Sequence, residues 1–144
     1  MLQILIAPLA AAIISQLIKF LIKSNNLKLN IQSFSTYAGM PSSHAAMATS
    51  LISSVGLTQG YSSPLFFICI IFSFFIIRDA LGLRNYVGQN GQVLNNLIKN
   101  LSDNKIIGQE KYPRLIEKIG HKPTQIIAGT ILGFLISLIC YYIF

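Results

Sequence analysis

The sequence predicts an all-α integral membrane protein, a polytopic bundle of about four transmembrane helices with an amphipathic interfacial helix in the 85–120 connection. Of its 144 residues, 53% are hydrophobic and only 10% are charged, whereas a soluble domain carries about 25% charged residues. The mean hydropathy is +0.61. Long apolar runs alternate with polar connections, and most of the runs approach the roughly 20 residues that a helix needs to cross a bilayer. The length fits a single membrane domain covering residues 1–144.

The first apolar run, residues 2–22, is long enough to span a membrane. It has no basic leader and no clear cleavage site, so we expect a retained helix and not a signal peptide. One face of this helix carries residues at a spacing of four, namely Ala7, Ala11, Ser15 and Lys19. Small residues let helices approach closely in lipid, which would point Lys19 into the bundle. The alternative is a lysine that snorkels to the headgroups near a helix end.

The second helix is expected to begin after a polar loop at residues 23–40. Pro41 disfavours helix at the residue before it, and Ser42 or Ser43 can then cap a new helix. The run from His44 to about Gln59 is short for a span and rich in alanine, serine and threonine. We therefore expect a central helix surrounded by the others.

The third span, Leu65 to about Leu83, is very apolar until it reaches Arg78, Asp79 and, just beyond it, Arg84. Ionisable groups at the end of a span usually face the bundle interior or the interface and mark function. The alternative is an Arg–Asp pair that merely ends the helix at the headgroups. After it comes a polar connection, in which apolar residues at helical spacing predict an amphipathic helix on the membrane surface, followed by a second short helix around residues 114–119.

The last span runs from Ile126 to about Phe144. Gly129 and Gly133 form a G-x-x-x-G pair, which creates a close-packing helix face. Packing within one chain is the simpler use, although a homodimer stays open. The two cysteines, Cys69 and Cys140, lie inside apolar runs and are expected to be packing residues without a disulfide or metal role.

Counting four spans places the loop after the first and the loop after the third on the same side of the membrane. The polar groups that meet there are Lys19, His44, Arg78, Asp79, Arg84 and His121. Eight lysines and arginines also lie in these two loops, and none lies in the opposite turn near residue 60. The positive-inside rule therefore predicts that the polar face is cytoplasmic.

Cationic groups and two histidines at one face suit phosphate chemistry. Arginine and lysine bind phosphoryl oxygens, and the N–H groups at a helix start, with the Ser42 and Ser43 hydroxyls, add donors. One histidine can attack phosphorus, and the other can protonate the leaving alcohol. The sequence has no carboxylate cluster for Mg²⁺ and no obvious third ligand for Zn²⁺, so we expect no metal and no cofactor. The basic residues lie between apolar runs, where topology explains them better than a nucleic-acid partner does.

Three motifs in order resemble the type 2 phosphatidic acid phosphatase and vanadium haloperoxidase superfamily. Residues 40–44, Met-Pro-Ser-Ser-His, resemble its P-S-G-H motif. Residues 120–129 resemble the end of its last motif, and residues 79–84, Asp-Ala-Leu-Gly-Leu-Arg, look like the D-A-x-G-x-R element of a divergent, shorter branch. That branch consists mostly of bacterial and plastid membrane proteins, so the resemblance implies the bacterial inner membrane or a plastid membrane.

The resemblance implies roles for individual residues. His121 would be the nucleophile and His44 the general acid, while Lys19 and Arg84 would bind phosphate with Arg78 as a further candidate. This chain departs from the pattern at Ser43, which replaces a glycine, and at Gln125, which stands where an aspartate normally orients the nucleophile. Glutamine can accept a hydrogen bond from the imidazole ring but brings no charge. Asp79 would substitute for that aspartate if the fold brings it within reach.

Two functions follow as the main hypotheses, beside a purely structural or assembly subunit. The first is an integral membrane lipid phosphatase, independent of metal, that hydrolyses a phosphate mono- or diphosphate ester of a phosphatidate-like or polyprenyl lipid through a phosphohistidine. The second is a non-catalytic membrane protein that keeps the anion pocket and binds or moves a phospholipid or polyprenyl phosphate. In both, the partners are a lipid phosphate and the surrounding membrane lipids.

Overall fold

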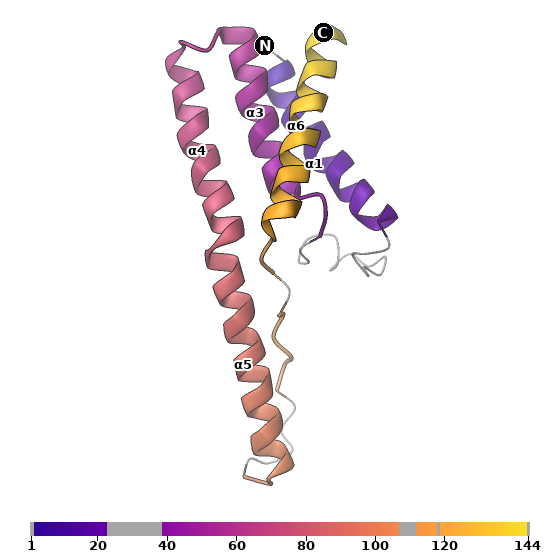
Figure 1. Cartoon of the computed structure of the whole chain (residues 1–144), viewed down its shortest axis with the longest axis vertical. Helices are drawn as coiled ribbons and strands as arrows, with labels where there is room; N and C mark the ends of the chain where they lie inside the picture. Colours follow the sequence, from indigo (N-terminus) through magenta and orange to yellow (C-terminus); the bar gives the residue numbers. More distant parts are fainter. Residues whose placement is uncertain (1, 23–38, 107–111, 118, 144) are drawn as a thin grey trace.

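The computed structural model describes residues 2–22, 39–106, 112–117 and 119–143, and its regular elements in those ranges are all helices. They are α1 (Gln3–Leu21), α3 (Ser43–Gln59), α4 (Pro64–Leu81), α5 (Leu83–Asp103) and α6 (Pro123–Ile143). Figure 1 shows α1, α3, α4 and α6 gathered in a bundle, with α5 extending away from one end and both chain ends at the other. The predicted helical membrane bundle is confirmed. The loop predicted over residues 23–40 falls mostly outside the described residues.

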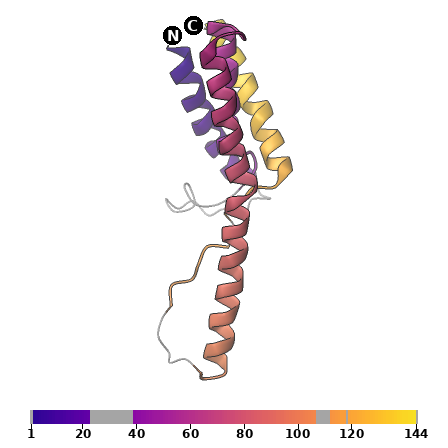
Figure 2. The same ribbon diagram turned by 90° about the vertical axis from the view of Figure 1, so that its left-hand side faces the viewer.

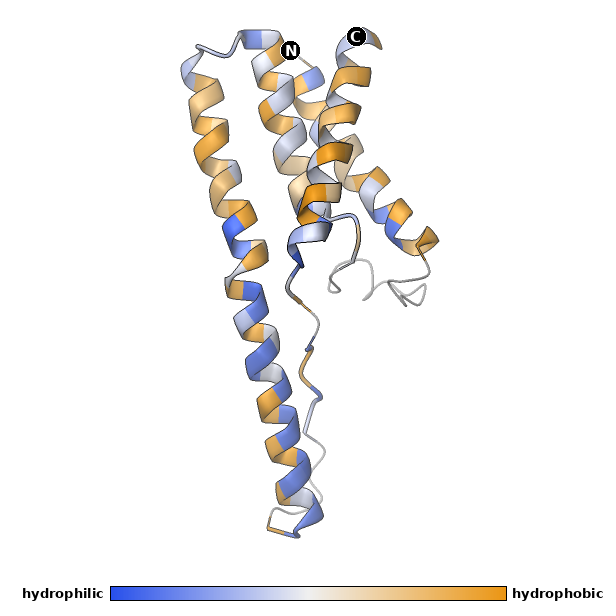
Figure 3. Cartoon of the chain, in the orientation of Figure 1, coloured by the Kyte–Doolittle hydropathy of each residue, from blue (hydrophilic) through white to orange (hydrophobic). Residues whose placement is uncertain are grey.

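Three helical stretches are long and apolar enough to cross a membrane: α1, the run from Pro64 to Asp103 that contains α4, and α6. The fourth helix of the bundle, α3, has 17 residues, or about 26 Å of helix at 1.5 Å per residue. It lies at the centre and packs against each of the other three. Figure 3 colours α4 and α6 mostly hydrophobic and α3 mixed, as expected of a helix that its neighbours shield from lipid.

Small residues allow α3 to pack closely against α1 and α6. Ala46 lies in one buried cluster with Ala7 and Ala11 of α1. A side chain at Gly133 would place its Cβ 2.1 Å from the Ala46 carbonyl oxygen, and one at Gly129 would lie 2.3 Å from the Ser42 carbonyl oxygen. The G-x-x-x-G pair is therefore used inside the chain, where it brings the α6 backbone onto α3.

Buried serines connect the same helices. The Ser50 and Ser137 hydroxyls lie 2.9 Å apart, and the Ser54 hydroxyl donates to the Ser137 oxygen at 3.3 Å. On the other side of α3, the Ser73 hydroxyl of α4 donates to the Ala48 carbonyl at 3.2 Å. Such interhelical hydrogen bonds hold membrane helices together where lipid offers no hydrophobic driving force.

The predicted amphipathic helix is present as α5, but it continues the direction of α4 instead of turning across the end of the bundle (Figures 1 and 2). Backbone hydrogen bonds run through the junction, because the Gly82 N–H donates to the Arg78 carbonyl and the Tyr86 N–H to the Gly82 carbonyl. A turn into the membrane plane would break this ladder. The start of α5 is therefore held in register with the last turn of α4.

The chain then returns along α5 without forming the second short helix expected around residues 114–119, so that prediction is wrong for residues 112–117. The reason is that the Asn95 side chain takes the backbone hydrogen bonds that Leu115 would make in a helix. The Asn95 amide accepts from the Leu115 N–H at 3.0 Å and donates to the Leu115 carbonyl at 2.9 Å. Gly88 and Gly91 give this segment room, since a Cβ on Gly88 would lie 2.5 Å from the Glu117 carbonyl oxygen. We call residues 112–117 the return segment.

Candidate functional site

The site begins where α3 and α6 start side by side. The Ser42 N–H donates to the Gln125 carbonyl at 2.9 Å, and the Ser42 hydroxyl caps α3 by accepting from the Ala45 N–H at 3.3 Å. The N–H groups of Ser43 and His44 in the first turn of α3 have no acceptor among the described residues. Unpaired N–H groups and the helix dipole favour an anion at such a position.

His121 enters this region from the connection that leads into α6. Its backbone N–H donates to the Ala80 carbonyl of α4 at 3.0 Å, and its side chain is only 3% exposed. The centroid of its ring lies 6.0 Å from that of the His44 ring, with the ring planes at 69°. The fold therefore brings together the two histidines, which are 77 positions apart in the sequence.

Three imidazole nitrogens at this pair have no hydrogen-bond partner within the described ranges: Nδ1 of His44 and both ring nitrogens of His121. All three are buried. Leaving a buried polar group unpaired costs about 1–3 kcal/mol, and the large majority of such groups in native proteins are paired. A ligand that bonds to these nitrogens would remove that cost, which marks the pair as the centre of the candidate site.

Two cations flank the histidines. The Lys19 ammonium, on a residue only 3% exposed, donates to the Ser43 hydroxyl at 3.2 Å. The stripe of small residues on α1 therefore does carry Lys19 into the bundle. Arg84, at the start of α5, is about one third exposed, and its Nε donates to the Asp79 carboxylate at 2.6 Å. Its two terminal amino groups have no partner among the described residues.

These surroundings keep His121 uncharged. Burial lowers the pKa of the His121 imidazole to about 4, and the neighbouring positive charges of Lys19 and Arg84 act in the same direction. At neutral pH the ring is therefore an uncharged imidazole with a free electron pair. That is the form a nucleophile or a hydrogen-bond acceptor requires.

Three of the sequence-predicted residues have other partners than the His121 ring, or none that an observed bond shows. Asp79 is engaged with Arg84, and the Gln125 side chain accepts from the Lys122 N–H at 3.0 Å, capping the start of α6. Neither reaches the His121 ring, whose nitrogens are both unpaired. Arg78 is exposed on α4, about 200° around the helix from the buried Ala80, and it does not pair with Asp79. The structure thus brings Lys19, Ser43, His44, Arg84 and His121 together, and no carboxylate among the described residues is bonded to the His121 ring.

Asn85 is a site-forming residue that the sequence analysis missed. Its amide donates to the Leu81 carbonyl at 2.7 Å and to the His121 carbonyl at 3.3 Å. A Cβ on Gly120 would lie 1.8 Å from the Asn85 Oδ1, so only glycine fits there. The available signals were a polar residue directly after Arg84 and a glycine directly before His121.

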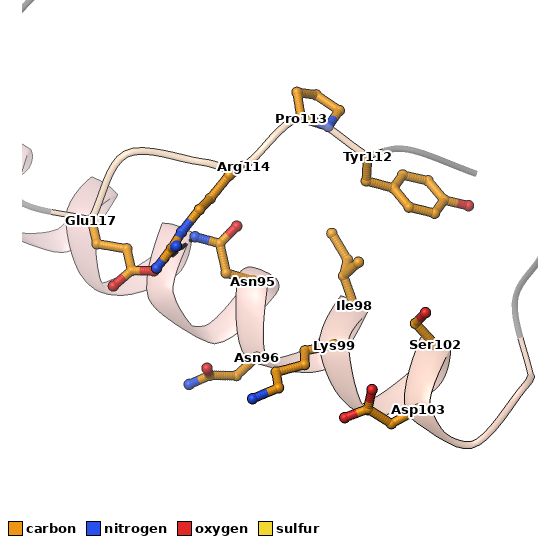
Figure 4. Close-up of a pocket in the computed structure, with 10 residues that line it drawn as sticks. All are labelled: Asn95, Asn96, Ile98, Lys99, Ser102, Asp103, Tyr112, Pro113, Arg114 and Glu117. Atoms are coloured by element: carbon orange, nitrogen blue, oxygen red, sulfur yellow. Dashed lines mark hydrogen bonds and ion pairs between the residues drawn. The ribbon is translucent and has the colours of Figure 1, made fainter. Parts of the chain in front are cut away.

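Figure 4 shows a separate, open cavity of about 640 Å³ between the end of α5 and the return segment, beyond the end of the bundle. Both positively and negatively charged side chains line this cavity, among them Lys99, Asp103, Arg114 and Glu117. It contains neither histidine, and its mixed lining does not single out an anion. In the described part of the chain, no group of three or more histidines, cysteines and carboxylates is placed to hold a metal ion.

Comparisons with known proteins identify the family of the chain. A family model described as "Divergent PAP2 family" matches residues 2–136. The chain is also similar to the uncharacterized membrane protein YuiD of Bacillus subtilis (strain 168), with 33% identity over 151 residues that cover 97% of this chain and 94% of the relative. No solved structure matches the chain.

Proposed function

The chain belongs to the divergent PAP2 family, and from this membership we propose that it is a metal-independent membrane phosphatase that hydrolyses a phosphate mono- or diphosphate ester of a lipid through a phosphohistidine. The observation that carries the proposal is the pair of His44 and His121, whose three buried ring nitrogens have no partner among the described residues. Two cations and the start of α3 surround this pair.

In the first step, an unprotonated nitrogen of His121 attacks phosphorus while the bond from phosphorus to the lipid oxygen breaks. His44, in the protonated form that the negative charge of a bound phosphate favours, donates its proton to the departing oxygen, so the lipid leaves as a neutral alcohol from a monoester or as a phosphomonoester from a diphosphate. The phosphoryl group is then bonded to His121. Lys19, Arg84 and the free N–H groups of Ser43 and His44 offset the negative charge on its oxygens.

In the second step, His44 removes a proton from a water molecule that attacks the phosphohistidine. The bond between phosphorus and nitrogen breaks, inorganic phosphate leaves, and His44 regains the proton it needs for the next cycle. The lowered pKa of His121 supports this assignment, because the ring is ready to attack without first losing a proton.

A lipid is the natural substrate for a site in this position. The reactive residues lie where the spans α1, α4 and α6 begin or end, which is where the headgroup of a membrane lipid lies. The basic residues of the two connections at this end favour the cytoplasmic side, under the positive-inside rule.

A second function is favoured by one observation: no carboxylate in the described part of the chain is bonded to the His121 ring, since Asp79 is bound to Arg84. A protein with this pocket could bind or move a phospholipid or polyprenyl phosphate without cleaving it. The two functions share the anion site and differ in whether a bond to phosphorus breaks.

Phosphate release by purified protein in detergent separates them. The substrates are a phosphatidate, a lysophosphatidate, and a polyprenyl phosphate and diphosphate, and the variants are His121→Ala and His44→Ala. We expect release by the wild type, its loss in His121→Ala, and a base-stable, acid-labile phosphoprotein in rapidly quenched samples of the wild type. Release that is unchanged in both variants would overturn the catalytic proposal. Binding of these lipids without release would favour the second function.

A further inference from the structure

Residues 120–121 are held in place by contacts from the junction of α4 and α5. The Ala80 carbonyl accepts from the His121 N–H at 3.0 Å, and the Asn85 amide donates to the His121 carbonyl at 3.3 Å. The histidine backbone is thus bound on both of its polar atoms. Its ring, by contrast, has no hydrogen-bond partner among the residues that the structure describes, so the place of the ring depends on where the backbone is fixed.

Asn85 is suited to this task because an amide group has two N–H donors in a fixed plane. One donor is bonded to the Leu81 carbonyl, four residues earlier, at 2.7 Å. This bond ties the side chain to the last turn of α4, so that the second donor is aimed at His121. Gly120 packs directly on the same side chain, since its hypothetical Cβ would lie 1.8 Å from Oδ1 and 2.7 Å from Cα of Asn85.

We propose that Asn85 is a positioning residue for the nucleophile: its amide fixes the backbone of residues 120–121 to the α4–α5 junction and thereby sets the place of the His121 ring. The proposal rests on the phosphatase function proposed above. In place of a carboxylate that orients the imidazole from its far side, this chain holds the histidine through its main chain.

The return segment offers a matched control. Asn95 lies ten residues further along α5 and also clamps the returning chain, through the Leu115 N–H, the Leu115 carbonyl and the Glu117 carboxylate. Its hydrogen bonds within the described residues go to Leu115 and Glu117 and not to residues 120–121. Asn95→Ala therefore loosens the return segment, whereas Asn85→Ala loosens residues 120–121 beside the site.

The test combines kinetics with chemical labelling of full-length protein in detergent. The variants are Asn85→Ala, Asn85→Asp and Asn95→Ala, each checked for a single symmetrical peak in size-exclusion chromatography. Asn85→Asp keeps the size of the side chain and its packing on Gly120 but presents oxygen instead of an N–H donor. The readouts are kcat, KM and the rate at which diethyl pyrocarbonate modifies each histidine, resolved by mass spectrometry because His44 and His121 lie in different peptides.

We expect both Asn85 variants to lower kcat by about 10- to 100-fold, as small displacements of reacting groups do, with KM within about twofold because Lys19 and Arg84 are untouched. The rate of His121 modification should rise several-fold, the rate at His44 should stay the same, and Asn95→Ala should resemble the wild type. A normal kcat and a normal His121 modification rate in both Asn85 variants would overturn the proposal. Equal effects from Asn95→Ala would overturn it too, because they would indicate general loosening.

Failure of the phosphatase function would be recognised separately. If the wild type hydrolyses no lipid phosphate, the proposed reaction is wrong for this chain. The labelling rates still decide whether Asn85 fixes His121, because modification by diethyl pyrocarbonate needs only an accessible, uncharged imidazole.

Discussion

Removing the Lys19 charge should weaken phosphate binding without weakening the fold. The Lys19 ammonium is buried, on a residue 3% exposed, and donates to the Ser43 hydroxyl at 3.2 Å beside the histidine pair. A hydrogen bond to a charged group contributes about 1.5–3 kcal/mol, which corresponds to about 10- to 150-fold in affinity at 1.4 kcal/mol per tenfold. We therefore expect Lys19→Met to raise the Kd for a lipid phosphate by that factor.

The assay is calorimetric titration in detergent with a short-chain lipid phosphonate, whose carbon–phosphorus bond resists hydrolysis. The matched control is Lys122→Met, which removes the same charge from an exposed position next to His121. Solvent and salt screen that charge, so its loss should change Kd less than about twofold at 0.15 M salt. Methionine in place of a buried ammonium should leave the unfolding temperature unchanged or higher. Equal Kd values for the two variants would refute the assignment of Lys19 to the anion site.

Other outcomes follow from packing, charge and hydrogen bonding. Gly133→Leu should lower the yield of folded, monodisperse protein and its unfolding temperature, because even a Cβ would lie 2.1 Å from the Ala46 carbonyl oxygen. The His121 ring should titrate by NMR with a midpoint near 4. In the unfolded chain the ring takes up its proton more readily, with a pKa near 6.5. The free energy of unfolding should therefore be constant above pH 6.5 and fall as the pH drops from there towards 4. A midpoint at 6.5 would contradict the burial argument. Ser137→Ala should lower the free energy of unfolding in mixed micelles by about 1 kcal/mol, because its hydrogen bonds to Ser50 and Ser54 are lost. The control Ile139→Ala, on the exposed face of α6, should lower that free energy less.

Patterns carried by single residues along one helix could be predicted from the sequence. The four-residue spacing from Ala7 to Lys19 indicated a buried face of α1, and the structure buries that face. The serine cap before His44 was also predictable, because capping is a local interaction between residues three apart. Convergence of the histidines followed from counting apolar runs, which needs no knowledge of packing.

Interactions between segments distant in sequence could not be predicted in the same way. The non-helical course of the return segment depends on Asn95, which lies twenty residues before Leu115. No local sequence pattern predicts the hydrogen bonds between these two residues. Asp79 and Gln125 were assigned by motif, but each side chain has a different partner in the fold. The Asp79 carboxylate accepts from Arg84, and the Gln125 side chain accepts from the Lys122 N–H at the start of α6. The role of Asn85 likewise depends on a contact 36 residues away.

The central position of α3 has a consequence for how the protein is made. This helix carries several serines and threonines and a histidine, so it would enter lipid poorly if it emerged from the translocation machinery alone. Its hydroxyl and carbonyl partners reside on α4 and α6, and α6 is translated last of the described helices. A nascent chain that ends before α6 would leave Ser50 and Ser54 exposed to lipid. Such a chain would expose polar side chains of α3 to lipid, which is a signal that membrane quality control could recognise.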